Sequence, residues 1–174
     1  MIKTTHNVLP DHIRLAALAA FPTADWPWWH RYASGKLATV DPSRIPEACR
    51  GALHALAHAV PPAAGFWDFD LYGAGLHLMP AGSSLGPHTD ATHHPQRPWR
   101  RLSSLVFFLD DCGGGELICG DETIAPRANT AARFAACQLH QVLPVVTDRK
   151  TLSLFAWEID HGPKQNTSAQ FQEG

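Results

Sequence analysis

The sequence predicts a mainly β fold with flanking helices, an antiparallel jelly roll against which the N-terminal helices pack. The chain has 174 residues, which suits one domain that removes roughly 70% of its unfolded surface from water. From Phe66 onward, short strand-like segments alternate with turns rich in Gly, Pro and Asp, a pattern typical of β-sandwiches and barrels. Long helices do not alternate with these strands, which argues against a parallel α/β sheet. We therefore expect one domain over residues 1–174, with a helical part over about 1–62, a jelly-roll core over about 66–160 and a polar tail over 162–174.

The helical part contains two candidate helices that end at prolines. The first covers residues 12–21, where Asp11 can cap the N-terminus and Pro22 ends the helix. The second covers residues 46–60 and ends at a pair of prolines. Both segments carry apolar residues at helical spacing, so each is expected to pack one face against the core.

Aromatic residues are crowded between these helices. Trp26, Trp28 and Trp29 lie within four positions of one another. Large rings cover the end of a hydrophobic core well, and we favour this interpretation over a platform for substrate.

The strand-like segments of the jelly-roll core are short and are separated by turn residues. Their ranges are 69–80, 102–111, 114–120, 122–126, 131–136, 138–146 and 150–159.

Composition excludes several function classes. The formal net charge of -2 and a pI near 6.6 provide no large positive field, so a nucleic-acid partner is not expected. The four cysteines form no CxxC pair, so we expect reduced thiols and no structural zinc site. No apolar run is long enough to cross a bilayer, and charged residues interrupt the N-terminal apolar segment. We therefore expect a soluble, cytoplasmic protein with no membrane partner.

A candidate metal site begins in the stretch GPHTDATHHP, residues 86–95. On an extended segment, His88 and Asp90 share a face and can reach one ion together. His140 is the candidate for a third ligand, because an unpaired imidazole inside an apolar strand would be costly. Two histidines and one carboxylate form the facial ligand set of non-haem iron(II) oxygenases, which leaves coordination positions open for chemistry.

A candidate anion site follows on the last strand. Arg149, Thr151 and Ser153 share one face of this strand, while Lys150 shares the other with leucines. A buried guanidinium beside a hydroxyl needs an anion, and its planar shape matches a carboxylate through two parallel hydrogen bonds. A small dicarboxylate such as 2-oxoglutarate fits this requirement.

Five motifs occur in an order that resembles a known family. They are PAGSSLGPHTDA, LSSLVFFLDD, GGGEL, APRANTAARF and HQVLPVVTDRKTLSLFAW, and together they cover roughly residues 70–158. This ordered set resembles the Fe(II)- and 2-oxoglutarate-dependent dioxygenases on their double-stranded β-helix, or jelly-roll, fold. Within that family the chain looks most like the prolyl 4-hydroxylase-like group.

The resemblance implies roles for individual residues. His88, Asp90 and His140 match the iron ligands. The clamp for the distal carboxylate of 2-oxoglutarate lies nine or ten residues after the last histidine in the family, which here selects Arg149 or Lys150; face parity favours Arg149.

The chain also departs from the family pattern. The aromatic hydroxyl often found near the glycine turn is missing, and Tyr72 and His77 are the candidate replacements.

The resemblance also implies an activity. The cofactors would be Fe(II), 2-oxoglutarate as cosubstrate and O2, with ascorbate as a candidate reductant. The reaction would hydroxylate a C–H bond of an unidentified peptide, such as a peptidyl proline, or of a small molecule, and would release succinate and CO2. The identity of that substrate and the oligomeric state are not encoded in these motifs.

A basic segment, residues 92–101, follows the metal pair. It reads either as a lid that recognises an acidic or peptide substrate, or as a solvated loop between two strands, and we favour the loop because exposed connections commonly carry charge. His93 and His94 are interpreted as loop residues rather than ligands. The arginines of the segment are Arg97, Arg100 and Arg101.

Three other functions compete with the dioxygenase. A cupin-like metalloenzyme would use a similar barrel and metal without 2-oxoglutarate, and would not need Arg149 in a buried pocket. A catalytically idle barrel would act as a binding module with vestigial histidines. A hydrolytic zinc site suits this open, oxygen-containing ligand set less well than iron(II).

Overall fold

The computed structural model describes residues 2–28, 30–31, 38–39 and 44–161. The predicted tail at 162–174 and the predicted packing role of Trp29 lie outside these residues. The helices are α1 (Asp11–Ala19) and α2 (Glu47–Ala59). The strands are β1 (Lys3–His6), β2 (His30–Arg31), β3 (Ala38–Thr39), β4 (Phe66–Trp67), β5 (Ala74–Met79), β6 (Leu85–His88), β7 (Trp99–Phe108), β8 (Leu117–Cys119), β9 (Glu122–Ile124), β10 (Thr130–Ala135), β11 (His140–Val142) and β12 (Arg149–Ile159).

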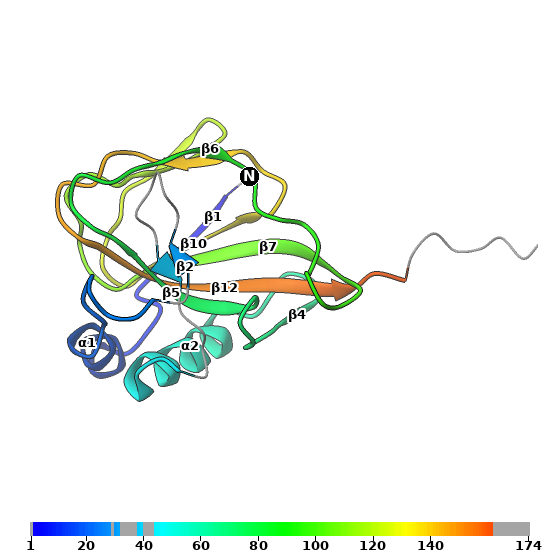
Figure 1. Cartoon of the computed structure of the whole chain (residues 1–174), viewed down its shortest axis with the longest axis horizontal. Helices are drawn as coiled ribbons and strands as arrows, with labels where there is room; N and C mark the ends of the chain where they lie inside the picture. The colour runs from blue at the N-terminus through cyan, green and yellow to red at the C-terminus, as the bar shows by residue number, and fades with distance from the viewer. Residues whose placement is uncertain (1, 29, 32–37, 40–43, 162–174) are drawn as a thin grey trace, which may run out of the picture.

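The strands form two antiparallel sheets. The larger sheet has the order β1-β10-β7-β12-β5-β3-β2, with β4 also paired to β12, and the smaller has the order β6-β11-β8-β9. The two sheets lie one above the other, and both helices lie on the far side of the larger sheet (Figure 1). The predicted jelly roll with helices outside it is confirmed.

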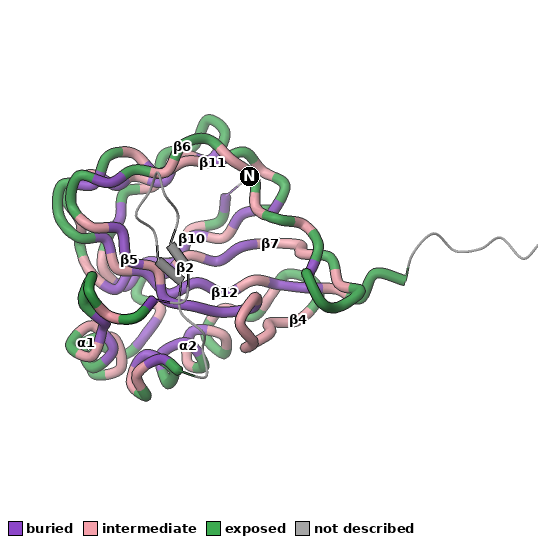
Figure 2. The backbone as a smooth tube through the Cα atoms, in the orientation of Figure 1, coloured by how far each residue is buried: buried purple, intermediate pink, exposed green. Residues whose placement is uncertain are grey.

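The central strands β7 and β12 explain why the molecule has two cores. On β12, Leu152 and Leu154 join the cluster under the helices, whereas Thr151 and Ser153 face the space between the sheets. This alternation is the period-2 pattern of an extended chain with both faces covered. Both faces of these strands are therefore largely buried, as Figure 2 shows in purple.

The helices pack their apolar stripes on the larger sheet. Leu53 and Leu56 of α2 have no exposed surface and belong to the same cluster as Leu152. Trp28 is buried in this cluster as well, which agrees with its predicted role at the end of the core. Among the described residues, no helix is both long and apolar enough to cross a membrane.

Two predictions for the N-terminal part are wrong. Asp11 does not cap α1: Pro10 occupies the cap position, no side chain caps the helix, and the Asp11 carboxylate contacts Arg14 one turn later. The part before residue 62 is also not purely helical, because β1 pairs with β10 as an edge strand of the larger sheet. The expected core range of 66–160 is therefore too short.

The buried Asn129 attaches the N-terminal segment to the sheet. Its side chain accepts a hydrogen bond from the Leu9 amide and donates one to the Leu9 carbonyl, each at 2.8 Å. Its backbone has a φ of 58°, a conformation that asparagine tolerates better than most residues. These two hydrogen bonds help to position β1 beside β10.

Candidate metal centre

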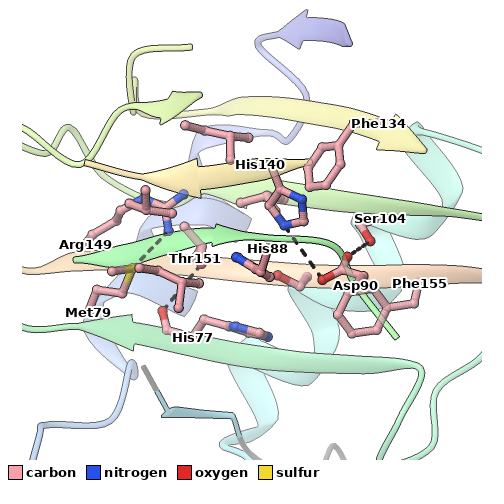
Figure 3. Close-up of a pocket in the computed structure, with 15 residues that line it drawn as sticks. His77, Met79, His88, Asp90, Ser104, Phe134, His140, Arg149, Thr151 and Phe155 are labelled. Carbon is pink, nitrogen blue, oxygen red and sulfur yellow. Dashed lines mark hydrogen bonds and ion pairs between the residues drawn. The ribbon is translucent and has the colours of Figure 1, made fainter. Parts of the chain in front are cut away.

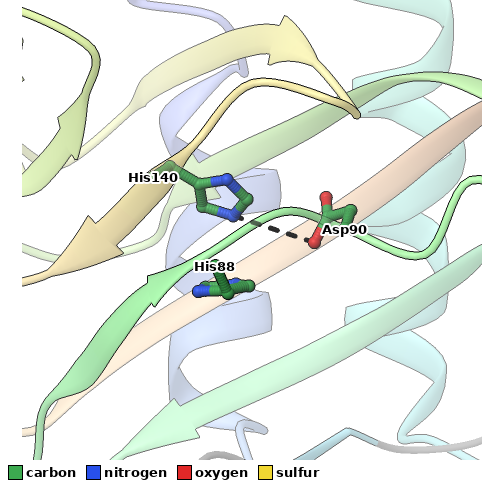
Figure 4. Close-up of side chains that lie close together, drawn as sticks. All are labelled: His88, Asp90 and His140. Carbon is green, nitrogen blue, oxygen red and sulfur yellow. Dashed lines mark ion pairs between the residues drawn. The ribbon is translucent and has the colours of Figure 1, made fainter.

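The structure brings the three predicted ligands together: His88 and His140 lie on two paired strands, and Asp90 lies just after the first of them. His88 ends β6, and His140 begins β11 directly opposite it in the smaller sheet. Asp90 follows β6 by two residues, and its amide donates to the Ala136 carbonyl at 3.1 Å. One ligating atom from each of the three side chains lies within 4.8 Å of the other two, and the side chains converge on one point (Figure 4).

The two imidazoles present the same nitrogen to that point. His88 Nδ1 lies 2.8 Å from the Gly86 carbonyl, and His140 Nδ1 lies 2.9 Å from the Gln138 carbonyl. Since a carbonyl only accepts, each neutral ring carries its proton on Nδ1 and leaves the Nε2 lone pair free. Hydrogen bonds of this kind fix the tautomer and orientation of metal-binding histidines.

Burial keeps His140 in the form that binds metal. Desolvation lowers the pKa of His140, and the neighbouring His88 lowers it further, against opposing effects of the Gln138 carbonyl and Asp90. The ring is therefore neutral at pH 7. Its Nε2 lies 3.7 Å from Asp90 Oδ1.

This donor set fits a divalent metal ion. Nitrogen and oxygen ligands bind such an ion at about 2.0–2.2 Å, so adjacent ligand atoms in an octahedral arrangement lie about 3 Å apart. The observed spacing within 4.8 Å requires only small side-chain adjustments to reach that geometry. Three ligands on one side of the ion leave the other side open.

A cavity between the two sheets connects the ligand cluster to the candidate anion site. It encloses about 500 Å³ including its open mouth, within the range of small-molecule sites. Asp90 lies toward one end and Arg149 toward the other (Figure 3). Apolar side chains form much of the wall between them, and they include Met79, Leu85, Val106, Leu117, Phe134 and Val142.

Arg149 is a buried cation without an anionic partner in the described parts of the chain. It is only 4% exposed, and its Nε has no hydrogen-bond partner. Its guanidinium contacts the Met79 sulfur at 3.8 Å and lies 5.0 Å from the centre of the Phe108 ring. Burial lowers the pKa of Arg149 to about 10, so the charge persists at pH 7. An uncompensated buried charge is costly, which indicates that this end of the cavity accepts an anion.

The glycine-rich motif makes room for this arginine. Gly115 has a φ of +71°, and a Cβ atom built there would lie 3.1 Å from Arg149 Cδ. A side chain at this position would be strained in its backbone and would crowd the arginine stem.

The remaining candidates for the anion site separate by position. Thr151 lines the cavity and is 1% exposed. Lys150, between Arg149 and Thr151 on the strand, is not among the cavity-lining residues, which agrees with the face parity. Of the candidate replacements for the aromatic hydroxyl, His77 lines the cavity, whereas Tyr72 instead contacts the His94 ring.

Most of the segment 92–101 is an exposed loop that leads into β7, as predicted, and His94 is its buried exception. His94 is 5% exposed, and its ring contacts Trp99 and Trp157. His93 is exposed, but its backbone bridges to Arg100. The burial of His94 could not be predicted from the sequence, because its partners Asp70 and Trp157 lie far along the chain. The three arginines all pair with carboxylates: Arg97 with Asp68 and Asp70 at 3.5 Å, Arg100 with Glu158, and Arg101 with Asp90 at 3.7 Å.

A second cluster of metal-ligand residues lies beside this segment. Asp68, Asp70 and His94 also bring ligating atoms within 4.8 Å of one another. Here the His94 Nε2 lies 3.2 Å from Asp70, and Arg97 forms an ion pair with each of the two carboxylates at 3.5 Å. This cluster ties residues 92–101 to the turn before β5.

The fold and the site define a class of protein: a jelly roll whose interior holds a two-histidine, one-carboxylate cluster at one end of a cavity and a buried cation at the other. Residues 74–157 match the family model of the 2OG-Fe(II) oxygenase superfamily. This range, slightly under half of the chain, contains the three candidate ligands and Arg149 and is similar to that superfamily. Its members use Fe(II), 2-oxoglutarate and O2.

Solved structures share the fold. A prolyl-4-hydroxylase from Pseudomonas putida is 21% identical with a TM-score of 0.63, over 89% of this chain and 91% of that one. A prolyl hydroxylase from Trichoplax adhaerens, solved with a peptide fragment of hypoxia inducible factor, is 16% identical with a TM-score of 0.61, over 90% and 83%. The non-haem alpha-ketoglutarate-dependent epimerase SnoN from nogalamycin biosynthesis is 16% identical with a TM-score of 0.67, over 90% and 77%. No curated protein sequence matches the chain.

Proposed function

We propose that the protein is an Fe(II)- and 2-oxoglutarate-dependent hydroxylase that acts on a C–H bond of a peptidyl proline or a similar neutral group. The observation that carries this proposal is Arg149, a buried cation that faces the ligand cluster across one cavity without a carboxylate of its own among the described residues. A dicarboxylate that reached from the metal to this guanidinium would compensate the charge. A cupin-like enzyme without 2-oxoglutarate has no use for such a group.

The residues of the chain have separable roles in this reaction. His88 and His140 hold the metal through Nε2, and Asp90 holds it through a carboxylate oxygen. Arg149 and Thr151 orient the distal end of the cosubstrate. When bound, iron(II) and 2-oxoglutarate supply the oxidising chemistry, in which O2 is consumed, succinate and CO2 are released and one oxygen atom enters the substrate. The apolar wall excludes water and limits wasteful turnover.

The charges around the segment 92–101 favour a substrate without strong negative charge. Each of its three arginines already pairs with a carboxylate of the chain, so an acidic substrate would have to displace those pairs. A peptide segment is compatible with this surface, and the Trichoplax adhaerens structure holds a peptide. We therefore propose a neutral peptide or small molecule as substrate.

An anaerobic optical titration tests the proposal without knowledge of the substrate. Protein freed of metal is titrated with iron(II) and then with 2-oxoglutarate, and a visible charge-transfer band reports a chelated keto acid. We expect the band in the wild type and in His93→Ala, a control that removes an exposed imidazole from the same stretch. It should vanish in His140→Ala.

The alternatives give different results. Iron binding without a band would favour a cupin-like enzyme, and absence of iron binding would favour an idle barrel that acts as a binding module. Asp90→Ala should abolish succinate formation, assayed with ascorbate as reductant, while circular dichroism remains that of the wild type. Turnover retained in Asp90→Ala would contradict the assigned ligand set.

A further inference from the structure

The two oxygens of Asp90 have different surroundings. Oδ1 faces His140 Nε2 at 3.7 Å. Oδ2 accepts a hydrogen bond from the Ser104 hydroxyl and lies 3.7 Å from Arg101 Nη1. The carboxylate therefore presents one oxygen to the ligand cluster, while the chain holds the other oxygen from behind (Figure 3).

A β-bulge places both of these groups on the same side of β7. Residues 101 and 104 are three apart, so regular alternation would put their side chains on opposite faces. The register between β7 and β12 shifts at this point: Ser103 pairs with Ala156, Arg101 pairs with Trp157, and Leu102 between them has no partner on β12. An extra residue of this kind reverses the parity of the strand, and such bulges re-aim side chains beside active sites.

Arg101 is held in place by aromatic rings as well as by charge. Its guanidinium carbon lies 3.9 Å from the centre of the Phe155 ring and 4.9 Å from that of Trp157. The side chain is only 11% exposed. Cation–π contacts favour this flat placement, so the guanidinium is fixed against Asp90 before any ligand binds. The adjacent Arg100 differs, because it is exposed and pairs with Glu158.

We propose that Ser104 and Arg101 are positioning residues that hold Asp90 as a ligand through Oδ1 alone. Ser104 sets the rotation of the carboxylate through its hydrogen bond, and Arg101 balances the charge on the outer oxygen. A carboxylate that ligates through one oxygen leaves a coordination position open that a two-oxygen mode would occupy. This inference rests on the proposed function, since it takes His88, Asp90 and His140 to be the metal ligands.

The test measures metal binding rather than turnover. Protein freed of metal is titrated with cobalt(II), whose visible bands report both affinity and coordination number. Loss of a group that orients a metal ligand typically weakens metal affinity by about 10- to 100-fold. We expect losses of this size, with altered cobalt bands, in Ser104→Ala and in Arg101→Met. Ser104→Thr keeps the hydroxyl and should restore the wild-type affinity and spectrum.

Matched controls lie next to both residues. Ser103→Ala removes a neighbouring hydroxyl that is not among the cavity-lining residues, and Arg100→Met removes an exposed guanidinium; both should bind cobalt(II) as the wild type does. Wild-type affinity and bands in Ser104→Ala and Arg101→Met would overturn the proposal. If Arg101→Met does not fold, Ser104→Ala decides alone. A wild type that binds no cobalt(II) or iron(II) would instead refute the proposed metal site.

Discussion

Replacement of Arg149 by methionine is the sharpest test of the cosubstrate pocket. The substitution keeps an apolar stem of similar length beside Met79 and Phe108 and removes only the guanidinium. A bidentate clamp makes two charge-assisted hydrogen bonds of about 1.5–3 kcal/mol each, about 3–6 kcal/mol together. Since 1.4 kcal/mol corresponds to a tenfold change in Kd, the variant should bind 2-oxoglutarate at least about 100-fold more weakly.

The same substitution should affect stability in an unusual direction. Most replacements of a buried side chain destabilise a protein, but Arg149 is a buried charge whose only described polar contact is a thioether sulfur at 3.8 Å. Its removal relieves desolvation, so the ligand-free variant should have a Tm equal to or above that of the wild type. When 2-oxoglutarate is present at 100 times its wild-type Kd, its binding should raise the free energy of unfolding of the wild type by about 2.7 kcal/mol. The same concentration should hardly change that of the variant.

Calorimetric titration and thermal melts with manganese(II) in place of iron(II) measure both effects without oxidation. Lys150→Met is the matched control, because it removes the adjacent cation, which is not among the cavity-lining residues. Its Kd for 2-oxoglutarate should equal that of the wild type. A large increase in Lys150→Met with none in Arg149→Met would refute the assignment of the clamp.

Two further predictions concern stability. Burial, followed by the charge of Arg149, lowers the pKa of His77 to about 4, whereas the pKa of a histidine in an unfolded chain is about 6.5. Between pH 4 and 6.5 the folded state therefore binds fewer protons than the unfolded state. The free energy of unfolding should fall by about 3 kcal/mol as the pH drops from 6.5 to 4. Urea melts in a chelator should show this slope in the wild type and a flatter one in His77→Phe; equal slopes would contradict the shifted pKa. Asn129→Ala should destabilise by about 2–4 kcal/mol, because it removes two buried hydrogen bonds and strains a positive φ, and Asn129→Gly should recover the part due to φ. Equal Tm values for these two variants would show that φ strain contributes nothing.

The central strands could be predicted from sequence because both of their faces carry information. In β12, apolar residues alternate with Arg149, Thr151 and Ser153, so the period of two and the polar face are visible in the letters alone. The edge strand β1 has no such signal, since its residues are half-buried or exposed. Its place depends on β10, more than 120 residues away, and on the hydrogen bonds of Asn129.

The metal-ligand cluster could be predicted for a similar reason, but the residues that hold Asp90 in place could not. His140 is conspicuous as a polar residue in an apolar strand. Regular alternation along β7 would point Ser104 and Arg101 to opposite faces of the sheet, and only the β-bulge at Leu102 brings both side chains to Asp90. The burial of His94 within its loop could not be predicted either, because its partner Asp70 lies 24 positions earlier. Bulges and distant ion pairs arise from tertiary packing, which local patterns do not encode.

A comparison of Arg101 with Arg149 shows why partners, rather than burial alone, indicate function. Arg101 and Arg149 both lie against aromatic rings with little exposure. Arg101 faces the carboxylate of Asp90, so its charge is compensated within the chain and its removal should disturb the residue it holds. Arg149 faces open space in the cavity, and its compensation must come from a ligand. The two substitutions should therefore have opposite signatures: Arg101→Met weakens metal binding, whereas Arg149→Met leaves metal binding intact and weakens the binding of the dicarboxylate.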